Sequence, residues 1–184
     1  MNLYIRVLWV ALIALCPLAG CSPGSGLPEL AAKPDVSYHL GPGDSVLIRV
    51  LGADELNGQY TVQDDGTVRM LLISSVPAAG LTADQLEAKI EEKLKAGRYL
   101  TQPHASVAII TYRPYYILGE VAGPGGYPYV SGMNVLSAVA AAHGYTYRAN
   151  QNFVILTRNG EESKADIMSP IRPDDIIRVP ERYF

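Results

Sequence analysis

The residues that could do chemistry in this chain are scattered. The three histidines, His39, His104 and His143, have no cysteine or clustered acidic residue at metal-ligand spacing. Glu120 interrupts an apolar run and is the one candidate for a catalytic carboxylate, but glycoside hydrolysis needs a second carboxylate across a cleft. No nucleophile motif, phosphate loop or dinucleotide fingerprint occurs. The sequence therefore predicts no catalytic residue, no metal site and no cofactor.

The adjacent acids Asp64 and Asp65 are better explained by a turn than by catalysis. They precede Gly66, and Asp-Gly between the strand-like runs 59–62 and 67–71 predicts a β-hairpin. Adjacent side chains at a hairpin tip point apart and into water, which does not suit a catalytic pair. Glycine, proline and aspartate mark the other expected turns, at Gly41, Pro42, Gly43, Asp44, Gly119, Gly123, Pro124, Gly125 and Gly144.

Tyrosine is over-represented, with 12 Tyr against 2 Phe and 1 Trp. The tyrosine-rich middle of the chain is expected to form a buried strand at 115–121, a turn at 122–126 and a short strand after it. Tyr115, Tyr127 and Tyr129 flank that turn. A tyrosine has an apolar face and a polar tip, so these three side chains are either half-buried strand residues, subunit contacts or polysaccharide contacts.

The N-terminus has the pattern of a bacterial lipoprotein signal. A nine-residue apolar run at 7–15 is too short to cross a bilayer core of roughly 30 Å. The sequence Leu-Ala-Gly-Cys at 18–21 follows it and resembles a lipobox. We therefore expect residues 1–20 to be a signal peptide, Cys21 to carry the lipid, and 21–36 to be a flexible tether.

The positions of the expected helices and strands indicate an α+β fold. Thr82 and Gln85 form the pattern of a capping box at the start of a helix that ends near Gly97. Asn134 is expected to cap a short helix at 135–142. The side chains of the second helix that we expect to face inward are those of Val135, Leu136 and Val139.

Two turns near the ends of the folded region echo each other. Pro42-Gly-Asp44 and Pro173-Asp-Asp175 each precede an apolar run that ends in Arg-Val. Between them, Asn159-Gly160 separates two strand-like runs and predicts a hairpin. The echo indicates a repeated turn-and-strand device rather than a duplicated domain.

Several motifs in one order resemble the outer-membrane polysaccharide export (Wza-type) lipoproteins. Tyr-x-Leu-Gly-Pro-Gly-Asp at 38–44 and Gly-Leu-Thr-x-x-Gln-Leu at 80–86 resemble their polysaccharide-export domain. Val-Ala-Gly-Pro-Gly-Gly-Tyr at 121–127 resembles the start of their SLBB domain, which has a β-grasp fold. The resemblance implies a small export domain at 37–112, with a mixed sheet and one helix, and an SLBB domain at 113–180. Its C-terminal strand, at 171–180, is a candidate for packing on the first domain.

The resemblance also implies a non-enzymatic role in exopolysaccharide or capsule secretion. It predicts a homo-oligomeric ring that faces the periplasm, an inner-membrane polysaccharide co-polymerase as partner and a separate outer-membrane protein. The polysaccharide is the expected cargo, and the lipid on Cys21 the expected outer-membrane anchor. A formal net charge of −3 with no basic block argues against nucleic acid as a partner. Two alternatives stay open: a monomeric, lipid-anchored carbohydrate-binding module, and a polysaccharide-modifying enzyme that uses Glu120.

Overall fold

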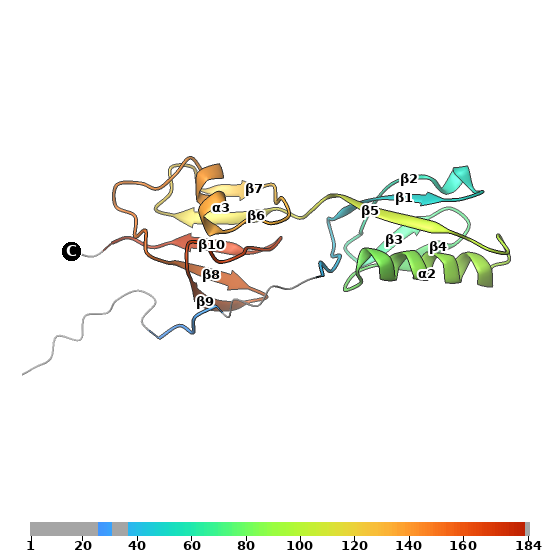
Figure 1. Ribbon diagram of the computed structural model, residues 1–184, viewed down its shortest axis with the longest axis horizontal. Coiled ribbons are helices and arrows are strands. Elements are labelled where there is room, and N and C mark those ends of the chain that lie inside the picture. The colour runs from blue at the N-terminus through green and yellow to red at the C-terminus, as the bar shows by residue number, and fades with distance from the viewer. Residues whose placement is uncertain (1–25, 31–36, 183–184) are drawn as a thin grey trace, which may run out of the picture.

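The chain forms two lobes, each with its own hydrophobic core. The computed structural model describes residues 26–30 and 37–182. The lobes lie end to end along the long axis of the molecule, and the segment between β5 and β6 connects them (Figure 1). The fold is α+β, as the sequence predicts.

The first lobe packs one long helix on strands. Strands β1 (Ser45–Val50), β2 (Gly58–Thr61) and β5 (Ala105–Thr111) form an antiparallel sheet in the order β2-β1-β5. A 3-10 turn (Asp54–Leu56) follows β1, and strands β3 (Thr67–Met70) and β4 (Ser74–Pro77) form a separate antiparallel pair. Helix α2 (Ala83–Ala96) buries its apolar stripe, Leu86, Ile90 and Leu94, in the core of this lobe.

The second lobe is a five-stranded sheet covered by a short helix, α3 (Val135–Ala141). The strand order is β7-β6-β10-β8-β9, and β10 pairs parallel to β6 and antiparallel to β8. The strands are β6 (Tyr115–Gly119), β7 (Gly125–Tyr127), β8 (Val154–Arg158), β9 (Glu161–Ala165) and β10 (Ile176–Val179).

Both helices begin with the side chains that the sequence indicates. Thr82 and Gln85 form a complete capping box on α2, and Asn134 and Ser137 form one on α3. These contacts satisfy backbone N–H groups that a helix leaves unpaired at its start. One expectation for α3 is wrong: Leu136 is 44% exposed, and Ala138 takes the buried position with Val135 and Val139.

The expected strand and turn limits around the tyrosines need correction. Strand β6 ends at Gly119, because that residue has a left-handed φ of 88°, and Val121 forms only an isolated bridge. Gly125 belongs to β7, where it pairs with Ile117, so it is a strand residue rather than part of the turn. Tyr129 lies beyond the end of β7.

The C-terminal segment belongs to the second lobe. Strand β10 lies at the centre of that sheet, between β6 and β8. Segment 171–180 is the expected candidate for packing on the first lobe, but its strand, β10, packs in the second lobe instead. The turn before the strand reaches the junction, where Asp174 faces Arg113.

The described part of the expected tether is docked rather than free. The backbone N–H of Leu30 donates to the carbonyl of Lys164 at 2.8 Å, and the N–H of Lys164 donates to the carbonyl of Pro28 at 2.8 Å. Leu30 packs against the core of the second lobe. Residues 28–30 thus cover part of the edge of β9, which corrects the expectation that all of 21–36 is a tether.

The N-terminal signal and Cys21 lie outside the described residues. Within residues 26–30 and 37–182, no helix is long and apolar enough to cross a membrane.

Candidate functional site at the junction of the two lobes

Two turns of the same construction meet at the junction. In each, the aspartate carboxylate accepts the backbone N–H of the residue three positions earlier: Gly41 to Asp44 at 2.8 Å, and Arg172 to Asp175 at 2.7 Å. The third residue of each turn has a left-handed φ, 93° at Gly43 and 72° at Asp174. Proline at the second position and positive φ at the third are typical of type II turns. The echo in the sequence is therefore a shared turn geometry.

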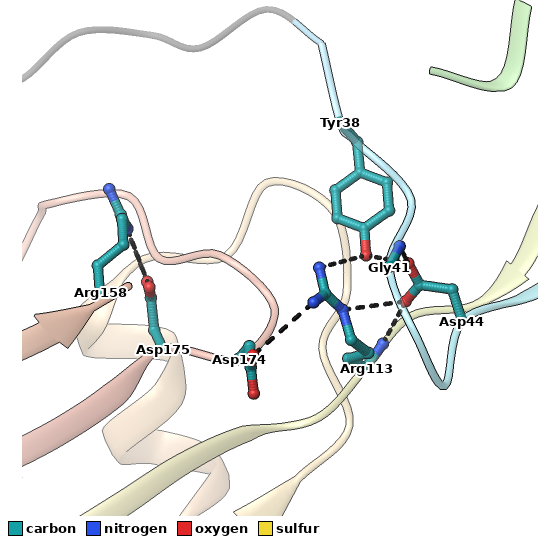
Figure 2. A network of polar contacts seen from close by, with 7 residues as sticks. All are labelled: Tyr38, Gly41, Asp44, Arg113, Arg158, Asp174 and Asp175. Carbon is teal, nitrogen blue, oxygen red and sulfur yellow. Dashed lines mark hydrogen bonds and ion pairs between the residues drawn. The ribbon is translucent and has the colours of Figure 1, made fainter. Parts of the chain in front are cut away.

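Asp44 is fully buried, and four groups surround its carboxylate (Figure 2). Besides Gly41, the hydroxyl of Tyr38 donates at 2.5 Å and the backbone N–H of Arg113 donates at 2.9 Å. The guanidinium of Arg113 lies 3.5 Å away, from Nε to Oδ1. A buried charge is tolerated only when it is paired and hydrogen-bonded, and this carboxylate is both.

Asp175 repeats this arrangement in the second lobe. It is 1% exposed, and Arg158 donates to both of its oxygens, from Nε at 2.9 Å and from Nη2 at 2.7 Å. Nη2 also donates to the carbonyl of Pro170 at 3.1 Å. This bidentate pair fixes the orientation of the guanidinium plane.

Arg113 links the two turns. Its Nη1 lies 3.7 Å from Oδ2 of Asp174, while its Nε faces Asp44. Burial lowers the pKa of Arg113, but the hydrogen bond to Tyr38 and the charges of Asp44 and Asp174 outweigh it, so that the pKa is raised. The side chain is therefore a permanent cation placed between carboxylates of both lobes.

A hollow of about 780 Å³ opens beside this network. Residues of both lobes line it, among them Tyr38, His39, Arg113, Tyr129, Arg158 and Asp174. Three tyrosine rings stand edge to face along the junction: Tyr38 with Tyr112 at 4.9 Å, and Tyr112 with Tyr129 at 5.4 Å between ring centres. The hollow thus combines fixed aromatic rings with fixed guanidinium groups.

The three candidate tyrosines have different environments. Tyr115 is fully buried, and its hydroxyl faces the carbonyl of Ala138 at 3.4 Å. This corrects the expectation that Tyr115 contacts a polymer or a subunit, because its ring lies in the core of the second lobe. Tyr127 is half-buried and donates to the carbonyl of Gly123 at 2.6 Å. Only Tyr129 lines the hollow.

Close approach explains two of the predicted turn glycines. A Cβ at Gly41 would lie 2.6 Å from Nη1 of Arg113, and a Cβ at Gly119 would lie 2.2 Å from the carbonyl oxygen of Val179. Pro42, Gly43 and Asp44 form the first junction turn. Gly123, Pro124 and Gly144 lie outside the junction network, as does Gly125 in β7.

The other residues that the sequence offers as candidates for catalysis or metal binding, Glu120 and the three histidines, do not form a cluster. Glu120 accepts a hydrogen bond from the hydroxyl of Thr146 at 2.5 Å. Within the described ranges, no group of three or more His, Cys, Asp or Glu side chains could hold a metal ion. Of the histidines, only His39 lines the hollow, where it is exposed.

Sequence reasoning missed the arginines that complete the site. Arg113 lies 69 positions from Asp44, and Arg158 lies 17 from Asp175. The repeated Pro-x-Asp turn was the available signal, because a buried aspartate requires a partner. It indicated the carboxylates but not which cations pair with them.

Replacing Tyr38 by Phe tests the first turn and its pH dependence. We expect Tyr38→Phe to lower the free energy of unfolding by about 2 kcal/mol near neutral pH, because Asp44 loses a donor. Burial, and then the hydrogen bond to Asp44, raise the pKa of Tyr38. The unfolded chain releases this proton near pH 10, so the contribution of Tyr38 is complete below about pH 10 and decreases above it.

The measurement is urea unfolding at about pH 8 and about pH 10.5. The deficit of Tyr38→Phe relative to the unmodified protein should shrink at the higher pH. Tyr147→Phe is the matched control, because Tyr147 is 81% exposed. An equal deficit at both pH values would contradict the assignment.

Comparison with known proteins agrees with the two-lobed structure. Residues 32–110 match the family described as "Polysaccharide biosynthesis/export protein", and residues 114–165 match the SLBB domain. One similar protein is "Exopolysaccharide production protein ExoF" of Rhizobium meliloti (strain 1021), 31% identical over 170 residues, which cover 78% of this chain and 40% of the relative. Another is "Polysialic acid transport protein KpsD" of Escherichia coli, 27% identical over 150 residues, 80% of this chain and 26% of the relative.

Proposed function

The chain belongs to the family of polysaccharide biosynthesis/export proteins, and we propose that it is a non-enzymatic component of a machine that secretes an exopolysaccharide or capsular polysaccharide. The observation that carries this proposal is the order of the two domains, an export domain followed by an SLBB domain, over most of the described chain. Since the chain spans well under two thirds of the length of either relative, their named roles in production and transport support the proposal without establishing it.

The junction favours a structural element over an enzyme. Its buried carboxylates, Asp44 and Asp175, are engaged by backbone N–H groups and guanidinium groups that hold the turns in place. Arg113 adds a contact from one lobe to the other. A body of two lobes held end to end suits the wall of an assembly through which a polymer passes.

We further propose that identical subunits assemble as a ring that faces the periplasm. The lipid on Cys21 would hold the ring at the outer membrane, with the folded lobes in the periplasm. The proposed partners are an inner-membrane polysaccharide co-polymerase and a separate outer-membrane protein. The exported polysaccharide is the cargo.

Purification of the lipoprotein in mild detergent tests the assembly. Light scattering after size-exclusion chromatography, with negative-stain images, should show a closed homo-oligomer. Cys21→Ser should leave the folded protein unanchored and recoverable without detergent. A strict monomer at all concentrations would contradict the ring and favour a carbohydrate-binding module, for which Tyr129 beside the hollow is the relevant feature.

Deletion of the gene tests the role in export. We expect loss of secreted polymer while the membrane fraction continues to incorporate sugar into polymer. Return of the unmodified gene should restore secretion, and Glu120→Gln should restore it equally, because the proposed role is not enzymatic. Unchanged secretion after deletion would refute the proposed function.

A further inference from the structure

The hollow at the junction has the size and lining of a ligand site. Its volume of about 780 Å³ falls within the range of roughly 300–1,000 Å³ that is usual for ligand pockets. Stretches far apart in the sequence meet there, among them residues 37–39, the loop that carries Tyr129, residues 157–160 with Arg158, and the turn at 172–175. Because both lobes contribute, the site exists only in the two-lobed protein.

The aromatic part of the lining is held in place. Tyr129 is half-buried, and its ring contacts Tyr112 edge to face with an interplanar angle of 78°. Tyr112 in turn contacts Tyr38 at 83°. An aromatic ring whose position is fixed by its neighbours offers an apolar surface at little entropic cost, and the C–H face of a sugar ring is a suitable partner for it.

The guanidinium of Arg158 lies beside that ring and is oriented so that it can donate a hydrogen bond to an anion. Its Nε and Nη2 bind Asp175, and the side chain is 18% exposed. In the part of the chain that the structure describes, no protein group accepts a hydrogen bond from its Nη1. Figure 2 shows a terminal nitrogen of Arg158 directed away from Asp175, with Tyr38 and Arg113 on the other side of the turn.

The carboxylates in the lining of the hollow are already paired. Arg113 faces Asp174, and Arg158 binds Asp175. The carboxylate of Asp175 is occupied by Arg158 and by the N–H of Arg172, so it offers little repulsion. A planar guanidinium recognises a carboxylate more specifically than an ammonium group does.

We propose that the hollow binds an acidic sugar residue of the exported polymer, with the sugar ring against Tyr129 and its carboxylate at Nη1 of Arg158. This inference rests on the proposed function, which supplies the polymer as the ligand. It assigns the junction a second role: the carboxylates that fix the turns also present a guanidinium to the cargo.

Titration calorimetry on the full-length lipoprotein in mild detergent, at low salt, tests this assignment. The probes are tetragalacturonate, the neutral maltotetraose, and inorganic phosphate. We expect tetragalacturonate to bind about tenfold more tightly than maltotetraose, because a charge-assisted hydrogen bond is added. Phosphate alone should bind weakly, because it lacks a sugar ring.

Two variants separate the two contacts. Tyr129→Ala should weaken tetragalacturonate binding about tenfold through loss of the ring. Arg158→Lys keeps a cation for Asp175 but loses the planar donor, and should reduce the preference for the acidic sugar to about that of the neutral one. Matched controls are Tyr147→Ala and Arg148→Lys, whose side chains lie outside the hollow and should leave affinity unchanged.

The outcomes also separate this inference from the proposed function. Absence of tetragalacturonate binding, equal affinity for the neutral sugar, or full affinity in Tyr129→Ala would each overturn the acidic-sugar site. Phosphate that binds as tightly as tetragalacturonate would show a simple anion site and would also overturn it. None of these results affects ring formation or loss of secretion after gene deletion, which test the proposed function separately.

Discussion

Asp44→Asn is expected to lower the free energy of unfolding of the first lobe by about 3–5 kcal/mol, the range for breaking a buried ion pair. Donors approach both carboxylate oxygens: the N–H of Arg113 at Oδ1, and the N–H of Gly41 with the hydroxyl of Tyr38 at Oδ2. The amide NH₂ of asparagine must replace one of these oxygens. The NH₂ group then faces the backbone N–H of either Gly41 or Arg113. Both groups are donors, so neither finds an acceptor there, and an unsatisfied donor in a buried site is destabilising.

The loss of charge adds to the loss of the acceptor. Arg113 is 23% exposed and would keep the carboxylate of Asp174 as a partner, at 3.7 Å. We therefore expect the contact between the lobes to loosen as well. Calorimetry should show a lower melting temperature for the first lobe, and limited proteolysis should show faster cleavage near residues 112–114.

Asp65→Asn is the matched control for this variant. Asp65 also accepts a backbone N–H and a hydroxyl, both from Thr67, but its side chain is 52% exposed. Water can replace those partners, so the expected loss is about 1 kcal/mol or less. Equal losses in the two variants would show that burial of Asp44 is not what makes it important.

Local signals predicted much of the fold. The capping box at Thr82, the helix cap at Asn134 and the hairpin at Asn159-Gly160 depend on residues within a few positions of one another. Such contacts can be deduced from spacing alone, because the geometry of a helix start or a tight turn is nearly fixed.

The Asp-Gly turn shows where local signals fail. The turn at Gln63–Gly66 forms, with the N–H of Gly66 donating to the carbonyl of Gln63 at 2.8 Å. The predicted hairpin does not extend beyond this turn, where the N–H of Gln63 also donates to the carbonyl of Thr67 at 2.8 Å, because β2 pairs with β1 and β3 pairs with β4. The choice between pairing partners depends on which apolar faces the rest of the lobe covers. That information is not contained in the turn.

The site was less predictable than the fold for the same reason. The sequence showed the repeated turns but not that Arg113 and Arg158 pair with them, since those contacts follow from the packing of distant strands. Tyr115 is the converse case: the sequence predicted a buried strand there but left contact with a subunit or a polymer open for this side chain, and the sheet places it in the core. Parallel pairing of β6 with β10 brings the second turn, residues 172–175, to the junction. No local sequence pattern predicts this pairing.

Gly119→Ala is expected to destabilise the second lobe by about 3 kcal/mol or more, through backbone strain and a collision. Gly119 pairs with Val179 where β6 and β10 run side by side (Figure 1). The carbonyl oxygen of Val179 accepts the N–H of Glu120 at 3.0 Å, and the new Cβ would lie 2.2 Å from that same oxygen. The oxygen of Val179 and the N–H of Glu120 belong to the backbone near the centre of the sheet. Neither can move without weakening the hydrogen bonds between β6 and β10.

Gly132→Ala separates the collision from the strain. Gly132 has a φ of 87°, almost the same as the 88° of Gly119, but nothing lies within 4 Å of a Cβ placed there. Its replacement should therefore cost about 1–2 kcal/mol, the strain of a left-handed alanine alone. Urea unfolding of the two variants measures the difference, which is the contribution of the contact with Val179. If the two losses were equal, backbone strain would explain the glycine at 119, and the close pairing of β6 with β10 would not require it.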